Sequence, residues 1–448
     1  MQNRQQSELV YELEDKPPFL QSFLAAIQHL LASFVAIVTP TLVIGGTLGL
    51  EAEVPYLISM ALIASGLGTF IQAYQPFGIG AGMICIQGTS FTFLSVILSA
   101  GFFVKDAGGN EDDMMALIVT ICFIGSFVQI GLSQVIPHIK HAVTPLVTGV
   151  VITSLGMSLI KVGVTDLAGG SDAENFGDPI NLLLGLFVIA VIIVMNNVSN
   201  NWIRLSSIVI GLVSGILAAV LMGQLNISDL STNSVIALPH PFRYGFHFDL
   251  SFFIPLVFLF VITSVETTGD ITANCVVSQQ PIKGPAYIKR VKGGVLGDGV
   301  SSMIAAVLNT FPNTTFSQNT GIIQLTGIAS RYVGMYVAFI LILFGLFQGL
   351  GEILQKIPKP VLGGAVLIMF GTVAATGIKI LASLQLNRRQ VMTIAVSLGL
   401  GLGISMVPDV LQRSPLIIQN IFNSAPATSG ITAMVLSFVL SKSSSESA

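Results

Sequence analysis

Long apolar runs recur along the whole chain and are separated by short polar connections. Most runs cover about 17–25 residues, which is the length that an α-helix needs to cross the hydrocarbon core of a bilayer. No long linker separates them, so the pattern predicts one polytopic all-α membrane protein with about fourteen segments. These segments are 23–46, 55–73, 79–100, 114–135, 141–162, 181–198, 204–223, 251–269, 292–309, 318–330, 333–355, 361–383, 390–407 and 415–440.

The tenth segment and the last two segments are irregular. The segment 318–330 is short for a span, and Pro408 and Pro415 interrupt the final two segments, which can therefore include interfacial pieces. Charges in the connections favour a cytoplasmic N-terminus, because basic residues collect in alternate connections. The basic residues expected inside are Lys140, Arg204, Lys283, Lys289, Arg290, Lys292, Arg331, Arg388 and Arg389, whereas the opposite connections carry acids such as Glu111, Asp172 and Asp229.

Composition narrows the class further. Hydrophobic residues make up 52% of the chain and charged residues only 9%, too few to cover the water-facing surface of a soluble protein of this size. The 19 basic and 22 acidic residues nearly cancel, so the chain offers no basic field for nucleic acid. The three cysteines lack metal-ligand spacing, and we expect buried free thiols and neither a metal nor a cofactor.

Two segments do not have the composition of ordinary lipid-facing helices. The third contains Gln87-Gly88-Thr89-Ser90-Phe91, and the tenth follows Asn313-Thr314-Thr315-Phe316. Interrupted segments at matching places in two halves of a chain indicate the midplane binding site of a transporter. Half-helices that begin after each interruption would direct backbone N–H groups at a bound substrate. The short echo of Thr-Ser-Phe and Thr-Thr-Phe can also arise by chance.

The titratable candidates are Glu266, Asp298 and His29, which lie inside apolar segments, and Asp270, which directly follows one; a charge at such a place is costly and therefore informative. Glu266 and Asp270 are four residues apart, on one face of a helix. A carboxylate there can accept hydrogen bonds from substrate N–H groups or hold a proton; the alternative for Glu266 is a structural pair with Lys or His. Asp298 lies among glycines and fits proton coupling or a structural hydrogen bond equally well. His29 is a structural group or a titrating one.

Two adjacent amides and several aromatic rings add candidate binding groups. Gln318 and Asn319 each offer a donor and an acceptor, as the mixed edge of a nucleobase requires. Phe91, Phe93 and Phe316 can supply stacking surface, although any one of them also fits a core or lipid-facing position.

The run from Gln318 to Gly327 resembles the signature of the nucleobase–ascorbate transporter family. That signature is Gln, Glu or Pro, then Asn, any residue, Gly, four residues, Thr, and Arg, Lys or Gly. The runs Gln87 to Phe91, Glu266 to Ala273 and Lys292 to Leu296 reinforce the resemblance, which covers nearly the whole chain. Within the family, the sequence is most similar to bacterial xanthine permeases.

The resemblance implies a fold of fourteen spans in two inverted seven-span repeats, with short antiparallel β-strands in spans 3 and 10. It further implies a core domain that moves against a gate domain, and a homodimer in the cell inner membrane with both termini cytoplasmic. The corresponding ranges are 1–22 for a cytoplasmic N-terminal segment, 23–135 and 251–355 for the core domain, 136–250 and 356–440 for the gate domain, and 441–448 for a polar tail.

The resemblance also implies roles for individual residues in proton symport of a purine. Glu266 would bind the N–H edge of the base and Gln318 would face it. Asn319 and Thr315 would complete the site, and the chain near Ser90, Phe91 and Phe316 would contact the base. Asp298, Asp270 and His29 would serve proton coupling and conformational change.

Three alternatives concern the substrate or the class of protein. The substrate can be xanthine, which Gln318 with Gly327 favours, or uric acid, or a broader range of purines. An anion carrier or channel can share this architecture, although an intramembrane Glu266 argues against it. A membrane enzyme lacks support, because the sequence contains no paired-His motif, nucleophile elbow or P-loop.

Overall fold

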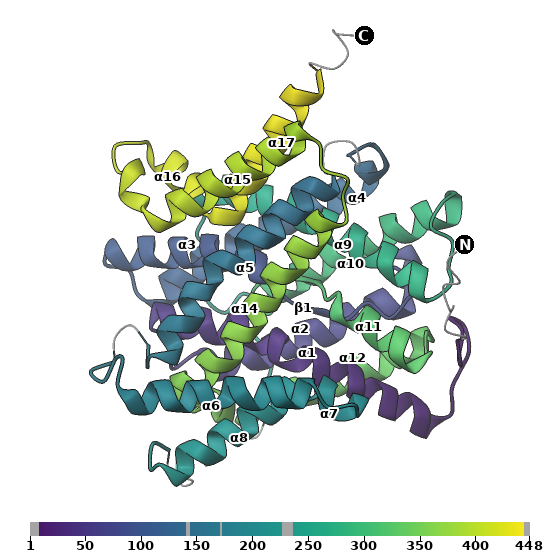
Figure 1. Ribbon diagram of the computed structural model, residues 1–448, viewed down its shortest axis with the longest axis horizontal. Helices are drawn as coiled ribbons and strands as arrows, with labels where there is room; N and C mark the ends of the chain where they lie inside the picture. Colours follow the sequence, from purple (N-terminus) through teal and green to yellow (C-terminus); the bar gives the residue numbers. More distant parts are fainter. Residues whose placement is uncertain (1–8, 140–143, 171–172, 226–235, 443–448) are drawn as a thin grey trace.

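The computed structural model describes residues 9–139, 144–170, 173–225 and 236–442 (Figure 1). Lys140, Asp172, Asp229, the first eight residues and residues 443–448 lie outside the described residues. The elements are α1 Phe19–Leu48, α2 Val54–Tyr74, η1 Pro76–Gly78, β1 Gln87–Thr89, η2 Phe91–Phe93, α3 Leu94–Asp106, α4 Glu111–Ile139, α5 Pro145–Leu167, α6 Pro179–Asn196, α7 Asn201–Leu205, α8 Ser207–Leu221, α9 Leu250–Val277, α10 Pro285–Val307, β2 Asn313–Thr315, α11 Gln318–Thr326, α12 Arg331–Leu346, α13 Gln348–Gln355, α14 Lys359–Ala382, α15 Arg388–Met406, η4 Pro408–Leu411, α16 Leu416–Phe422 and α17 Ala425–Lys442.

Among the described residues, eight helices are long and apolar enough to cross a membrane, and the bent pair α12–α13 would make a ninth span. The eight are α1, α2, α4, α5, α6, α9, α14 and α15. Two shorter apolar helices, α8 and most of α17, lie beside them. The predicted polytopic helical membrane protein is therefore confirmed, whereas the count of fourteen spans stays a prediction.

Segment 333–355 was expected to be one helix, and that expectation is wrong. α12 and α13 meet at a bend of 75°, where Phe347 leaves the helical region with φ −92° and ψ 92°. Both pieces pack on α2 through glycines: a Cβ at Gly345 would lie 2.7 Å from the Ser59 carbonyl oxygen, and one at Gly351 would lie 2.6 Å from that of Pro55. The bend lets both pieces keep this close backbone contact with α2.

The expected extended pieces in segments three and ten are confirmed as a two-stranded antiparallel sheet. β1 pairs with β2 in the register Gln87 with Thr315, Gly88 with Thr314, and Thr89 with Asn313. Helical structure resumes soon after each strand, in α3 and in α11. The sheet thus joins two segments that are far apart in the sequence and leaves a helix beginning beside each strand.

The ends of the strand pair are closed by further backbone bonds. Ser90 N–H donates to the Pro312 carbonyl at 2.9 Å, and Phe316 N–H donates to the Ile86 carbonyl at 3.0 Å. Gly88 is packed so closely that a Cβ would lie 2.6 Å from the Phe316 ring. All six strand residues are buried, so protein covers this non-helical backbone, as hydrocarbon surroundings require.

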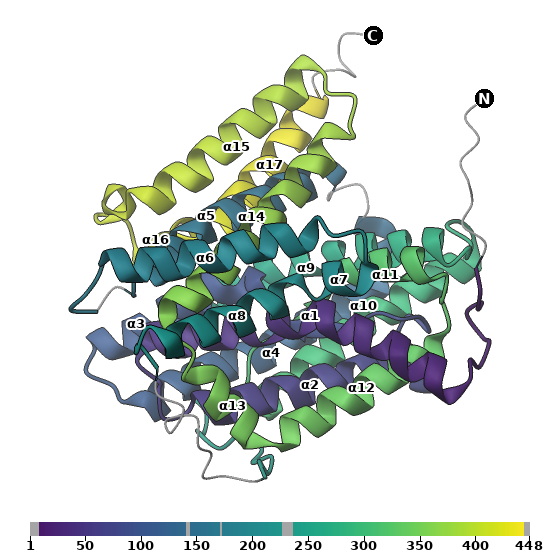
Figure 2. The same cartoon turned by 60° about the horizontal axis from the view of Figure 1, so that its bottom comes forward.

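Most helix contacts fall into two groups, and in Figure 2 α5, α14 and α15 lie above α1, α2 and α12. In one group, α2 packs against α12 and α10, and α4 packs against α9 and α10. In the other group, α5 packs along α14 and α17, and α6 packs against α14 and α8. The strands lie with α1, α2 and α10 of the first group.

The α5–α14 contact depends on glycines that bring the two backbones together. A Cβ at Gly156 would overlap the backbone of Ala374, one at Gly363 would overlap that of Leu167, and one at Gly377 would overlap that of Thr153. Small residues at helix interfaces allow this approach in membranes, where close packing rather than the hydrophobic effect drives association.

We expect Gly377→Ala to destabilise the protein, because the added methyl would collide with the rigid Thr153 backbone. Overpacking of this kind costs about 1–3 kcal/mol. Gly371→Ala on the same helix is the matched control, since a Cβ there meets no atom within 4 Å. Thermal unfolding of the purified protein, monitored by size-exclusion chromatography, should give a lower Tm for Gly377→Ala only. Equal midpoints for the two variants would contradict the close contact.

Candidate functional site

A cavity of about 840 Å³ lies between the two helix groups. Its walls come from α1, α9, α11 and the strand ends on one side, and from α5, α8 and α14 on the other. This volume is within the range of about 300–1,000 Å³ that is typical of small-molecule sites. The cavity therefore lies where two packed units meet, beside the only β-sheet among the described residues.

Seven of the ten predicted site residues line this cavity. They are Ser90, Phe91, Glu266, Asp270, Thr315, Phe316 and Gln318. The other three, His29, Asp298 and Asn319, are buried behind the wall and are not among the lining residues. The structure thus brings together residues from η2, α9, β2 and α11, and it separates a lining set from a supporting set.

Glu266 lines the cavity without a protein partner. Its carboxylate forms no hydrogen bond or ion pair with any described residue, so the alternative of a structural pair with Lys or His is not formed. Asp270, one turn further along α9, accepts a hydrogen bond from Thr315 Oγ1 at 2.8 Å. The strand pair therefore holds Asp270, whereas Glu266 remains open to a ligand.

Gln318 faces the same cavity from the first turn of α11. Its side chain is exposed to the cavity and forms no hydrogen bond with the described residues. The backbone N–H groups of Ser317 and Gln318 likewise donate to no described backbone carbonyl. The cavity thus combines a free carboxylate, a free amide and unpaired N–H groups at a helix N-terminus, which together can bind a planar ring with both N–H and C=O edges.

Asp298 joins three helices behind the cavity. The residue is fully buried in α10, and its Oδ2 accepts hydrogen bonds from Gln129 Nε2 of α4 at 2.6 Å and from Thr267 Oγ1 of α9 at 2.8 Å. Thr267 is the neighbour of Glu266 in sequence. A change in the charge of Asp298 would therefore act on the helix that carries Glu266.

His29 and Asn319 form a buried pair between α1 and α11. His29 Nδ1 lies 2.9 Å from Asn319 Oδ1, and His29 Nε2 has no partner among the described residues. With the amide oxygen as acceptor, Nδ1 carries the proton that is donated. Successive helix residues point about 100° apart, so Gln318 and Asn319 do not both face the cavity. Asn319 lies behind the cavity wall and is not a lining residue.

The aromatic candidates divide between the cavity and the core. Phe91 and Phe316 line the cavity, and Phe91 packs edge-on against Phe370 of α14 with ring centroids 5.2 Å apart. Phe93 instead packs against Phe260 at 4.6 Å and is fully buried. Phe93 is therefore a core residue, as its alternative interpretation held.

The wall from the second helix group was missed by sequence reasoning. It includes Thr148 of α5 and Met369, Thr372 and Thr376 of α14. The threonines at i and i+4 of an apolar segment were the available signal, but hydroxyls of this kind usually bond to their own helix. Thr372 and Thr376 do so, donating to Met369 and Thr372 carbonyls.

The ionisable residues of the lining are all acids. Glu266 and Asp270 line the cavity, and no Lys, Arg or His is among the described lining residues. The described residues contain no group of three or more His, Cys, Asp or Glu that could hold a metal. The three cysteines are buried and unpaired, as expected. An anion would find no countercharge in this cavity.

A family model described as Permease family matches residues 20–410. The chain belongs to this permease family. It is 46% identical over 440 residues to the Xanthine permease XanP of Escherichia coli K12, covering 97% of this chain and 95% of the relative. It is 41% identical over 442 residues to the Xanthine permease XanQ of the same organism, covering 98% and 95%. The resemblance to nucleobase–ascorbate transporters is thereby confirmed, and the chain is a permease, not an enzyme.

A solved structure shows the same fold at low sequence identity. The transmembrane domain of the cyanobacterial bicarbonate transporter BicA superposes with a TM-score of 0.60 at 14% identity, over 93% of this chain and 99% of that one. At this identity the likeness concerns the fold alone. It agrees with the predicted helical membrane fold.

We expect Asn319→Leu and Gln318→Leu to separate support from lining. Asn319→Leu leaves a buried His29 N–H unpaired, which costs about 1–3 kcal/mol, and should lower Tm. Gln318→Leu changes an amide that already lacks a protein partner and should leave Tm within error of the parent protein. Thermal unfolding of both purified variants measures this. A lower Tm for Gln318→Leu alone would contradict the assignment.

Proposed function

We propose that this permease imports a purine base, with xanthine favoured, by proton symport. The proposal is supported mainly by one observation. Glu266 and Gln318 line the same cavity, and neither the carboxylate nor the amide has a protein partner among the described residues. The names of the relatives XanP and XanQ, both xanthine permeases, support the choice of substrate.

In the proposed complex, the ring lies between α9 and α11. Glu266 accepts hydrogen bonds from ring N–H groups, and Gln318 pairs with an opposite edge that carries N–H and C=O groups. The N–H groups of Ser317 and Gln318 are free to donate to a ring carbonyl. Phe91 and Phe316 cover the ring faces, and Ser90 and Thr315 close the site beside the strands. Asn319 orients α11 through His29.

Proton coupling in this proposal follows from two acids that share one cavity. When the purine binds, it displaces water from the Glu266 carboxylate, which lies beside Asp270. A proton taken up together with the purine offsets the cost of the buried negative charge. Asp298 connects to the same helix through Thr267, and His29 connects to α11 through Asn319. We assign Asp270, Asp298 and His29 to proton coupling and conformational change.

The proposed architecture is fourteen spans in two inverted repeats, with cytoplasmic termini and a homodimer in the inner membrane. The core domain would consist of residues 23–135 and 251–355, and the gate domain of residues 136–250 and 356–440. The two helix groups with a cavity between them support this division. An elevator motion would carry the strand pair and its bound base past α5 and α14.

Two substrate alternatives and one alternative of another class remain as outcomes of testing. Uric acid or a broader set of purines would use the same carboxylate and amide. An anion carrier or channel is favoured by the shared fold with a bicarbonate transporter, but it is opposed by a lining that carries two carboxylates and no cation among its described residues.

Replacing Glu266 by Gln should abolish or severely reduce uptake of labelled xanthine by cells. The variant keeps the size of the side chain but loses an acceptor oxygen and the charge that proton coupling balances. Glu111→Gln, which changes an exposed acid at the start of α4, is the matched control and should transport normally at equal protein abundance. Parental uptake by Glu266→Gln would refute the assigned role.

Xanthine addition to proteoliposomes should move protons in the same direction as the base. A pH-sensitive dye outside the vesicles should report alkalinisation, and uptake should rise as external pH falls because protons are a co-substrate. In competition against labelled xanthine, uric acid, guanine and hypoxanthine define the purine range, and uracil serves as the non-purine comparison. Xanthine uptake without any proton movement would overturn the symport mechanism.

A further inference from the structure

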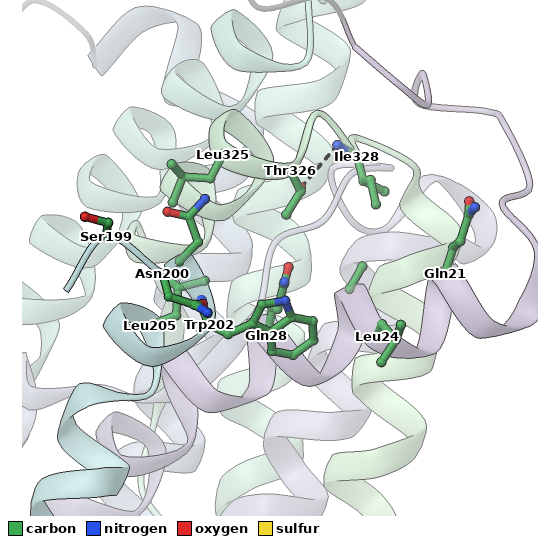
Figure 3. Close-up of a pocket in the computed structure, with 12 residues that line it drawn as sticks. Gln21, Leu24, Gln28, Ser199, Asn200, Trp202, Leu205, Leu325, Thr326 and Ile328 are labelled. Carbon is green, nitrogen blue, oxygen red and sulfur yellow. Dashed lines mark hydrogen bonds between the residues drawn. The ribbon is translucent and has the colours of Figure 1, made fainter. Parts of the chain in front are cut away.

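A second cavity of about 540 Å³ lies near the N-terminal end of α1. Figure 3 shows its walls: α1 on one side, the turn between α6 and α7 on another, and the end of α11 above them. Its lining residues are Gln21, Leu24, Ala25, Gln28, Ser199, Asn200, Asn201, Trp202, Leu205, Leu325, Thr326 and Ile328. We call it the α1–α7 cavity.

The α1–α7 cavity and the central cavity share helix faces. Along α1, residues 21, 24, 25 and 28 line the α1–α7 cavity and residues 31, 32, 35 and 36 line the central one. This spacing of three and four places all eight on one face of the helix. On α11, Gly321 lines the central cavity and Leu325, four residues later, lines the α1–α7 cavity. The two cavities therefore follow one another along a common wall.

Gln28 is a polar group without a protein partner in this wall. The residue is only 9% exposed, and its amide, which forms no hydrogen bond with any described residue, remains accessible from the cavity. In Figure 3 the amide points from α1 toward Thr326. A free amide offers both a donor and an acceptor, so the cavity is suited to a ligand that carries both.

Trp202 supplies an aromatic surface on the opposite side. It is the only Trp of the chain and is 39% exposed. Asn200 caps the helix that carries Trp202, because Asn200 Oδ1 accepts the Trp202 backbone N–H at 2.9 Å. This bond leaves the Asn200 amide nitrogen free to donate. A Trp ring with free amides around it is a surface on which a nitrogen heterocycle can stack and form hydrogen bonds.

The lining of the α1–α7 cavity excludes ionic ligands. None of its lining residues is Lys, Arg, His, Asp or Glu, so neither a phosphate headgroup nor a cation would find a countercharge. A neutral planar ring with polar edges matches both the free amides and the indole.

We propose that the α1–α7 cavity is a second binding site for the transported base, occupied on its way between the central cavity and the cytoplasm. The identity of the base and the cytoplasmic side rest on the proposed function. In this site the base stacks on Trp202 and forms hydrogen bonds with Gln28 and Asn200. Release then proceeds in two steps along one face of α1.

The single Trp makes the site directly observable. We would titrate xanthine into the purified full-length protein and record the fluorescence lifetime of Trp202, which ultraviolet absorption by the base does not distort. Labelled xanthine binding is measured on the same samples, and the part of it that Glu266→Gln loses reports the central site. The variants are Gln28→Leu, Glu266→Gln and, as matched control, Asn197→Ala, an exposed amide of the same turn that does not line the cavity.

Saturable shortening of the lifetime is the expected result for the parent protein, the Asn197→Ala control and Glu266→Gln, whose central site is impaired. Gln28→Leu should shift the midpoint of this change upward by about tenfold, as loss of one or two buried hydrogen bonds implies, while labelled xanthine still binds centrally. Three results would overturn the second site: a parent lifetime that does not change with xanthine, a Glu266→Gln lifetime that does not change, or a Gln28→Leu midpoint equal to that of the parent. Absence of labelled xanthine binding to the parent would instead contradict the proposed function.

Discussion

Backbone hydrogen bonds between β1 and β2 join residues 87–89 to residues 313–315, and the arrangement of the site depends on them. Extended backbone inside a membrane protein needs hydrogen-bond partners from the protein, because neither water nor lipid replaces a missing hydrogen bond there at low cost. The two strands satisfy each other and are covered by α1, α2, α9 and α10. Their pairing fixes where α3 and α11 begin, and so it places the free N–H groups of α11 and Gln318 opposite α9.

The same pairing organises the buried charges. Thr315 at the end of β2 donates to Asp270, so one of the two lining carboxylates is tied to the sheet and the other, Glu266, is left free. Behind them, Asp298 and the His29–Asn319 pair connect neighbouring helices to α9 and α11. A protonation change at any of these groups therefore acts on helices that line the cavity, which is the physical requirement for coupling a proton to a substrate.

Much of this site could be predicted from sequence because polar residues in hydrocarbon are rare and costly. Thr and Ser around Gln87 and Asn313 marked the interrupted segments, and Glu266 stood out as an acid inside an apolar segment. Which neighbour faces the cavity was harder, since Gln318 and Asn319 differ only in helical rotation. The α12–α13 bend and the unpaired Gln28 could not be foreseen, because both depend on contacts with α2 or α7 that the local sequence does not encode.

A structure of the protein with xanthine bound, determined by electron cryomicroscopy in nanodiscs, would test the proposed site most directly. Density for the base should lie between Glu266 and Gln318, within hydrogen-bonding distance of both, with β1 and β2 still paired beside it. Density for the base away from Glu266 at saturating xanthine, or continuous helices in place of the two strands, would contradict the proposed site.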